Sequence, residues 1–225
     1  RTRRSIGRLW RSLPMTLDIM NHSNQAIMNG VDGRRQVDEC AEDTPLQALS
    51  LAEGIDHPWY RCQALSAVAA HIEPHLLAKV INAAINAGLQ AHDENRRVEV
   101  LVWPLQASFN RNEIGLANKV LNVIMSELRK PMDPISGWCA SSVVDAIKGN
   151  QQLMNKFWGT FKLATARGHG WRVEKTLTRL INDPDVASNV KYARYVRERL
   201  QSILDWKTRN NASPTHHQQT VSEHR

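Results

Sequence analysis

The chain has 225 residues, of which 42% are hydrophobic and 23% are charged, and its formal net charge is +7. This composition excludes an intrinsically disordered chain. No apolar run approaches the roughly 20 residues that cross a bilayer, so we expect no membrane span. Three cysteines at no ligand-like spacing exclude a disulfide framework and a thiolate zinc site, and they fit a reducing, cytoplasmic location.

The positive charge is concentrated at the two ends of the chain. Residues 1–35 contain seven Lys/Arg and two acids, residues 167–209 contain ten and five, and residues 36–166 contain eleven and fourteen. A nucleic-acid-binding protein usually concentrates basic charge on its working surface, so this distribution weakens that function. The candidate surface for nucleic acid is the basic C-terminal end, with Arg172, Lys175, Arg179, Arg194 and Arg197.

Residues 1–43 are expected to form a flexible basic extension and a linker. A helix over residues 1–20 would be amphipathic and Arg-rich, which is also compatible with a membrane anchor or a transit peptide. We favour a non-functional extension, because the chain does not begin with Met and Met15 is an alternative start. Residues 21–43 are polar and contain Gly30 and Gly33, which predicts a linker.

Helical patterns begin at Thr44. The tetrapeptide Thr44-Pro45-Leu46-Gln47 matches a capping box with Pro at the first helical position, and this helix is expected to stop near Gly54. Breakers such as His57-Pro58 and Asp183-Pro184 then separate segments of about 12–18 residues with helical periodicity. No segment sustains a period of two, so the sequence predicts an all-α chain.

These helices repeat along the chain. Lys79-Val80-Ile81-Asn82 returns at Lys119 and at Lys156, at spacings of 40 and 37. Paired helices that recur about every 33–42 residues indicate an α-solenoid, here of about four to five repeats over residues 44–209. The last helix, about residues 189–207, has the polar outer face of a terminal repeat, and residues 210–225 are expected to be a disordered polar tail.

The segment Ile55-Asp56-His57-Pro58-Trp59-Tyr60-Arg61-Cys62-Gln63-Ala64-Leu65 resembles the interhelix turn and second helix of the HEAT-like repeat family, and Asp133-Pro134 begins a second such turn. The resemblance covers residues 44–206. It implies an array that binds proteins or nucleic acid, with no fixed catalytic motif.

In HEAT-like arrays the second helix of each pair lines the concave surface, so the resemblance implies a binding groove. The residues expected to line it are Arg96, Glu99, Trp103, Trp138, Asp145, Trp171, Glu174 and Lys175. Tryptophan and arginine with interspersed carboxylates are typical of binding hot spots. The alternative is that Trp138 and Trp171 pack on the neighbouring helix pair, and Pro104 is expected to kink the helix that carries Trp103.

The expected function is therefore non-catalytic: an adaptor, scaffold or regulator that binds a protein partner, with no catalytic residue, metal or cofactor. A nucleic-acid-binding protein is the first alternative. The second is an enzyme similar to the HEAT-like DNA glycosylases of alkylated purines, in which Trp138 and Asp145 would stabilise a cationic sugar. The spacing of Trp and Asp in that family is not reproduced here, which argues against the enzyme.

Overall fold

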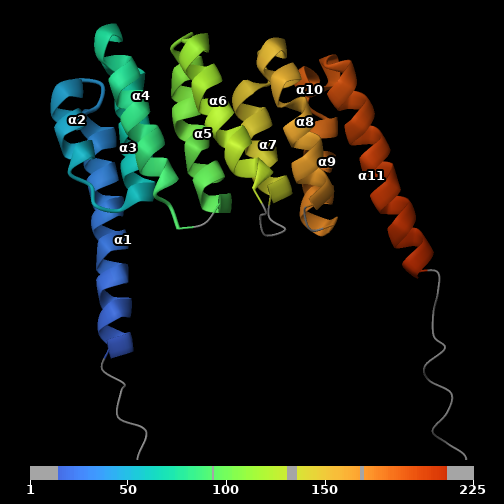
Figure 1. Cartoon of the computed structure of the whole chain (residues 1–225), viewed down its shortest axis with the longest axis horizontal. Helices are drawn as coiled ribbons and strands as arrows, with labels where there is room; N and C mark the ends of the chain where they lie inside the picture. The colour runs from blue at the N-terminus through green and yellow to red at the C-terminus, as the bar shows by residue number, and fades with distance from the viewer. Residues whose placement is uncertain (1–14, 93, 131–135, 168–169, 212–225) are drawn as a thin grey trace, which may run out of the picture. The chain divides into compact units, whose positions relative to one another are not determined.

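The computed structural model describes residues 15–92, 94–130, 136–167 and 170–211. Within these ranges the chain forms eleven α-helices and no strand, which confirms the all-α prediction (Figure 1). The expected extension over residues 1–14 and the tail from residue 212 lie outside the described residues. Asn210 and Asn211, which we assigned to the tail, belong to the last helix.

The chain divides into two compact units. Within the described residues, unit 1 contains residues 15–92 and 103–117, and unit 2 contains residues 94–102, 118–130, 136–167 and 170–211. The boundary passes through helices α5 (Glu94–Asn110) and α6 (Ile114–Arg129), so both helices contribute residues to each unit. Each unit has its own set of fully buried aliphatic residues.

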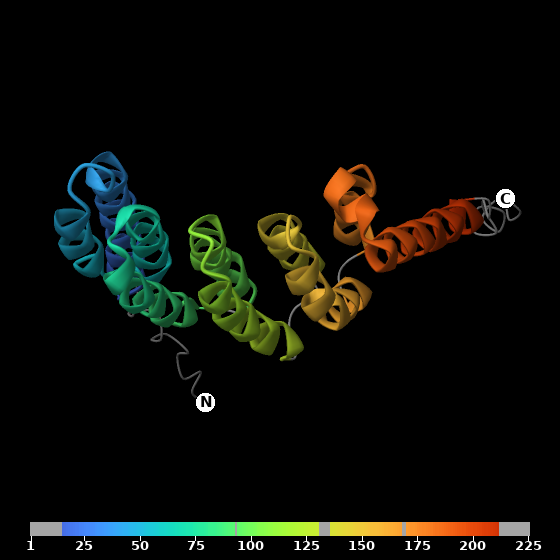
Figure 2. The same cartoon turned by 90° about the horizontal axis from the view of Figure 1, so that it is seen from above.

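Unit 1 is built around helix α3 (Pro58–His71), which packs on α4 (Pro74–Leu89) and on α1 (Met15–Cys40). The short helix α2 (Pro45–Glu53) packs against α1 and α3 (Figures 1 and 2). Each of α2, α3 and α4 begins with Pro, whose fixed φ and missing N–H suit the first turn of a helix.

Helix α1 corrects the predicted linker. Residues 21–40 are helical, and Val37 is fully buried. Gly30 and Gly33, which we interpreted as breakers, instead allow close packing. A Cβ at Gly30 would come 2.5 Å from Cδ2 of Tyr60, and one at Gly33 would come 3.0 Å from Cγ1 of Ile55. The linker prediction is therefore wrong over residues 21–40, because glycine here serves the contact between helices.

Helix α2 has the predicted limits but not the predicted cap. It begins at Pro45, ends at Glu53 and is followed by Gly54, as expected. Thr44 makes no side-chain cap, and its hydroxyl donates to the backbone carbonyl of Cys40 at 3.2 Å. The capping box is therefore not formed, because the end of α1 accepts the hydroxyl that would have capped α2.

Unit 2 contains α7 (Ser136–Ile147), α8 (Gln151–Arg167), α9 (Gly170–Ile181), α10 (Pro184–Ser188) and α11 (Val190–Asn211). Helix α7 packs on α8 and α9, and α9 packs on α10 and α11. An aromatic cluster joins α8 to α11: the rings of Trp158 and Tyr192 lie 4.9 Å apart, and the buried Tyr192 hydroxyl donates to the carbonyl of Met154 at 3.0 Å. This cluster anchors the last long helix.

The repeated lysines occupy matching places in their helices. Lys79, Lys119 and Lys156 are each the sixth residue of their helix, counted from the first residues of α4, α6 and α8. All three are exposed, and the residue after each of them is buried. An array of repeated helices requires such a shared position.

Candidate functional site

The residues predicted to form a binding surface fall in both units. Seven of the eight lie in unit 2, on helices α5, α7 and α9. These are Arg96, Glu99, Trp138, Asp145, Trp171, Glu174 and Lys175. Trp103 lies on the part of α5 that belongs to unit 1.

The three predicted tryptophans are exposed to solvent. Trp171 keeps 61% of its surface accessible, Trp138 keeps 39% and Trp103 keeps 38%. Packing into a neighbouring helix pair would have buried these rings, so Trp171 in particular is not a core residue. Exposed aromatic side chains that lie close to polar groups are a common feature of binding surfaces.

Three contacts connect the exposed sides of α7 and α9. The Lys175 ammonium lies 5.7 Å from the centre of the Trp138 ring. The Arg179 guanidinium contacts the Asp145 carboxylate at 2.6 Å. Lys148 donates to Asp183, just beyond the end of α9, at 2.5 Å.

These contacts form a row along two parallel helices. Each contact pairs a residue of α7, or Lys148 directly after it, with a residue 34 to 37 positions later. The later the first residue lies along α7, the later its partner lies along α9. Helices α7 and α9 therefore run in the same direction. We call the set Trp138, Asp145, Lys148, Trp171, Lys175, Arg179 and Asp183 the α7–α9 row.

Helix α9 also contacts α11. The ammonium of Lys207 contacts the carboxylate of Glu174. One turn before Glu174, the exposed ring of Trp171 lies 4.9 Å from the Arg172 guanidinium carbon. The neighbour of Lys207, Trp206, is 61% exposed, so α11 presents a further accessible ring beside this ion pair.

The predicted residues of α5 take separate places. Arg96 and Glu99 are exposed in unit 2. In unit 1 the Arg34 guanidinium lies 4.7 Å from the centre of the Trp103 ring, and it also donates to the buried Gln63 side chain at 3.1 Å. Trp103 is thus held by α1, the helix that sequence analysis had interpreted as a linker.

Asp183 is the most constrained charge in the row. Its carboxylate caps α10 by accepting from the backbone N–H groups of Asp185 and Val186 at 3.0 and 3.3 Å. Burial opposes ionisation, but Lys148 and these two N–H groups outweigh it and lower the pKa of Asp183. The same hydrogen bond is the main cause of a raised pKa at Lys148.

The chemistry of the row is that of recognition. Its carboxylates already bind arginine or lysine, and Lys175 of the row lies beside a tryptophan ring, as does the neighbouring Arg172. Among the described residues, no group of three or more His, Cys, Asp or Glu could hold a metal ion. None of the described helices combines the length and the apolar character needed to cross a membrane.

Sequence analysis missed Arg179, a member of the row, and Trp206, an exposed ring outside the row. Arg179 was assigned to a separate basic surface, although it lies 34 residues after Asp145, close to the offset that relates successive second helices. Trp206 was not selected, because it follows Ile203 by three residues and continues the apparent apolar face of the last helix. The repeat offset is a sequence signal that could have found the first.

No family model matches the chain, and comparisons with curated proteins and with solved structures find no match.

Proposed function

We propose that the chain is a HEAT-like repeat protein that binds a protein partner through the α7–α9 row, as a non-catalytic adaptor, scaffold or regulator. The observation that carries the proposal is Trp171, which is 61% exposed beside a row whose charges are paired. A large rigid ring loses little entropy on binding and buries much area, so it is typical of hot spots.

Contacts within unit 2 support the repeat architecture. Helix α11 runs parallel to α8, because Asn189 donates a hydrogen bond to Gln151 and Tyr192 donates one to Met154, three positions later in both segments. Helices α7 and α9 also run parallel, which makes two layers of parallel helices. Stacked helix pairs of a solenoid have this arrangement.

Pairing of charges favours a protein over nucleic acid as the partner of this surface. Binding to a phosphate backbone needs cations that are available to phosphate. In the row, Arg179 is held by Asp145 and Lys148 by Asp183, so the local charge is largely neutralised. The Arg179 contact also occupies the Asp145 carboxylate, which argues against a catalytic role for that residue.

The test compares two equally exposed tryptophans. Trp171→Ala and Trp206→Ala each remove a ring that is 61% accessible, but only Trp171 belongs to the row. Proteins that the full-length chain retains from an extract of its native host are identified, and the Kd of a purified partner is measured by calorimetry. Trp171→Ala is expected to weaken binding at least tenfold, and Trp206→Ala less than threefold.

Thermal melts of both variants provide the folding control. Exposed substitutions usually change the free energy of unfolding by about 0.5 kcal/mol or less, so both variants should melt close to wild type. Equal Kd values for wild type and Trp171→Ala would show that the row is not the binding surface.

A basic hollow supports nucleic acid as a second candidate partner. Between α8 and α11 lies a hollow of about 310 Å³ with the aromatic rings of Trp158 and Tyr195. Three cations, Lys162, Lys191 and Arg194, line it together with one carboxylate, Glu198. Rings beside cations suit stacked bases and phosphates. Binding of single-stranded RNA that weakens steeply with salt, and that Lys191→Gln with Arg194→Gln abolishes, would support this function.

A further inference from the structure

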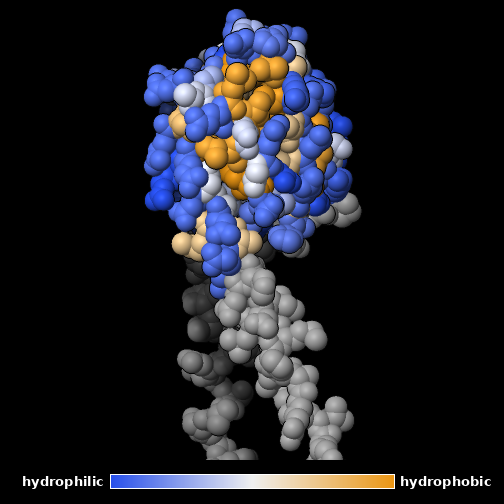
Figure 3. All heavy atoms as spheres, turned by 90° about the vertical axis from the view of Figure 1, so that its left-hand side faces the viewer, coloured by the Kyte–Doolittle hydropathy of each residue, from blue (hydrophilic) through white to orange (hydrophobic). Residues whose placement is uncertain are grey.

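The second surface of interest lies in unit 1, on helices α1 and α2. Five of the twelve large apolar side chains that are exposed within the described residues lie on these two helices. They are Ile27, Met28, Val31, Leu46 and Leu51. Figure 3 shows apolar side chains gathered within a hydrophilic surround on this side of the molecule. Of these five side chains, Leu51 lines a hollow between the two helices.

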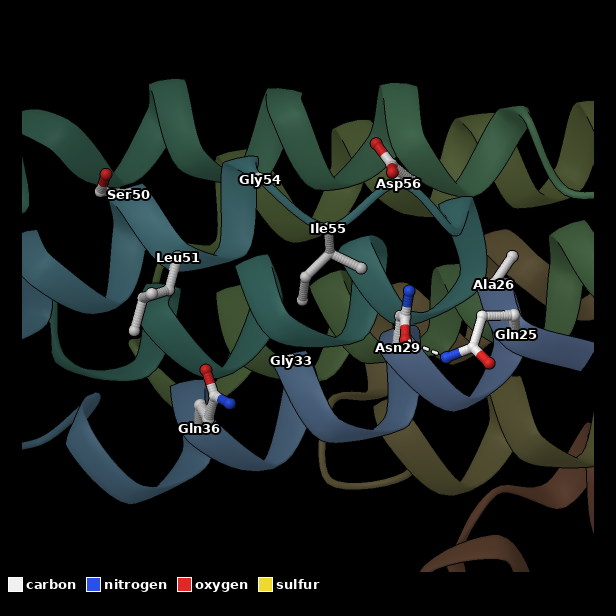
Figure 4. Close-up of a pocket in the computed structure, with 11 residues that line it drawn as sticks. Gln25, Ala26, Asn29, Gly33, Gln36, Ser50, Leu51, Gly54, Ile55 and Asp56 are labelled. Atoms are coloured by element: carbon white, nitrogen blue, oxygen red, sulfur yellow. Dashed lines mark hydrogen bonds between the residues drawn. The ribbon is translucent and has the colours of Figure 1, made fainter. Parts of the chain in front are cut away.

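A hollow of about 570 Å³ lies between α1 and α2. Figure 4 shows the side chains of Leu51 and Ile55 directed toward α1, opposite Asn29 and Gln36. The hollow exists because α2 has only 9 residues beside the 26 of α1 and leaves part of the longer helix uncovered.

The segment of sequence that forms this hollow has a charge opposite to that of the whole chain. Residues 24–56 contain seven acids and two arginines, whereas the whole chain has a net charge of +7. Both arginines are engaged: Arg34 contacts Asp38 at 3.3 Å, and Arg35 contacts Asp32 at 3.2 Å. Glu53 and Asp56 are exposed and form no ion pair within the described part of the chain, and Asp56 lines the hollow itself.

We propose that the groove between α1 and α2 binds a basic amphipathic helix of a partner protein. The apolar face of that helix would cover Leu51 and its neighbours, and its lysines or arginines would meet Asp56 and Glu53. Apolar anchors surrounded by complementary charge are how a groove recognises an amphipathic helix.

The same charge disfavours the other occupants. Two copies of this chain that paired through the groove would bring two acidic segments together, which costs free energy. An anionic membrane or a nucleic acid would be repelled in the same way. A basic helix is the occupant whose charge complements the groove.

The test uses two labelled 14-residue peptides, one of Leu and Lys at helical spacing and one in which every Lys is replaced by Glu. Fluorescence anisotropy with the full-length chain is expected to show that the Leu/Lys peptide binds at least tenfold more tightly than the Leu/Glu peptide. The net positive charge of the protein alone would favour the opposite order. Equal binding of the Leu/Glu peptide, or no binding of the Leu/Lys peptide, would overturn the proposal.

Matched variants locate the binding. Leu51→Ser and Leu89→Ser remove leucines that are 38% and 36% exposed, and only the first lines the groove. Asp56→Lys and Glu113→Lys make the same charge change inside and outside it. Leu51→Ser and Asp56→Lys should each weaken Leu/Lys binding at least fivefold, the two controls less than twofold, with thermal melts to verify folding.

Two further measurements decide between this site and others. Trp171→Ala should leave peptide binding unchanged, so a failure here is distinguishable from a failure of the α7–α9 row. A dimer in sedimentation velocity that Leu51→Ser dissociates would assign the groove to a second copy and overturn the proposal. A groove that binds the peptide equally well in Leu51→Ser and wild type would overturn it as well.

Discussion

Replacement of Asp183 gives a stability change that follows from its contacts. The carboxylate accepts two backbone N–H groups of α10 and the Lys148 ammonium, and its side chain is 14% exposed. Loss of an N-cap costs about 1 kcal/mol. The bond to Lys148 adds about 1 kcal/mol, because that lysine is 34% exposed and solvent weakens the pair. Asp183→Ala should therefore lower the free energy of unfolding by about 2 kcal/mol.

Asp183→Asn separates the two contributions. The amide oxygen of asparagine can still cap α10, so this variant should lose only the charge interaction, about 1 kcal/mol. The pKa of Asp183 is lowered in the folded chain, so its ionised form stabilises the fold above the unfolded pKa near 3.9. This stabilisation disappears as the pH falls through the folded pKa. Wild type and Asp183→Asn should thus differ at pH 7, and the difference should shrink as the pH falls below the unfolded pKa toward the lowered pKa of the folded chain.

The assay is urea denaturation followed by circular dichroism between pH 7 and pH 3. Glu198→Gln serves as the control, because it removes an exposed carboxylate of α11 that has no ion pair among the described residues. It should change the free energy of unfolding by about 0.5 kcal/mol or less. Equal stability of Asp183→Asn and wild type at pH 7, or a difference that does not shrink as the pH is lowered, would refute the assigned role of the Lys148 pair.

Two further predictions concern buried positions. In the native protein a thiol reagent should modify the half-buried Cys40 rapidly and the buried Cys62 and Cys139 only after unfolding, since burial raises the pKa of Cys62 to about 12. Gly30→Ala should destabilise the fold by about 1–2 kcal/mol, because its Cβ would lie 2.5 Å from a ring carbon of α3. Gly159→Ala, with nothing within 4 Å of its Cβ, should stabilise the fold by about 0.5–1 kcal/mol. Thiol titration and urea denaturation measure these effects, and equal changes at the two glycines would contradict the packing argument.

The helical class and several boundaries could be predicted because their signals are local. Pro45, Pro58, Pro74 and Pro184 each begin a helix, and Gly54 follows the end of one. Proline acts through its own φ and missing N–H, so its effect is readable without the tertiary structure.

Helix α1 could not be predicted by the same reasoning. Its composition is polar, and Gly30 and Gly33 count against a helix on intrinsic propensity. What favours the helix is contact with Tyr60 and Ile55, which lie more than 20 positions later in the sequence. Tertiary packing here overrides local helix propensity, and these distant contacts cannot be predicted from the local sequence of residues 15–40.

The sequence predicted which residues lie on the candidate surface better than it predicted which of them contact each other. Alignment of the second helices of the repeats placed Trp138, Asp145 and Lys175 on the groove-facing sides of two successive second helices, and the structure brings Lys175 to Trp138. The same alignment did not connect Asp145 with Arg179, because a residue's partner depends on how far one helix is shifted along the next. That shift is set by packing, and a difference of one turn would exchange every partner in the row.

The two surfaces should respond differently to salt, and this separates their proposed partners. In the α7–α9 row four of the five charges form two ion pairs, and Lys175 lies over the Trp138 ring, so binding there should depend mainly on buried aromatic area and change little with ionic strength. The groove of unit 1 is lined by the exposed Asp56, and the exposed Glu53 lies three positions before it in the sequence, so binding of a basic helix should weaken as salt screens these charges. A chain with both properties can hold one partner through each unit, and a salt titration of each complex would identify the surface that holds it.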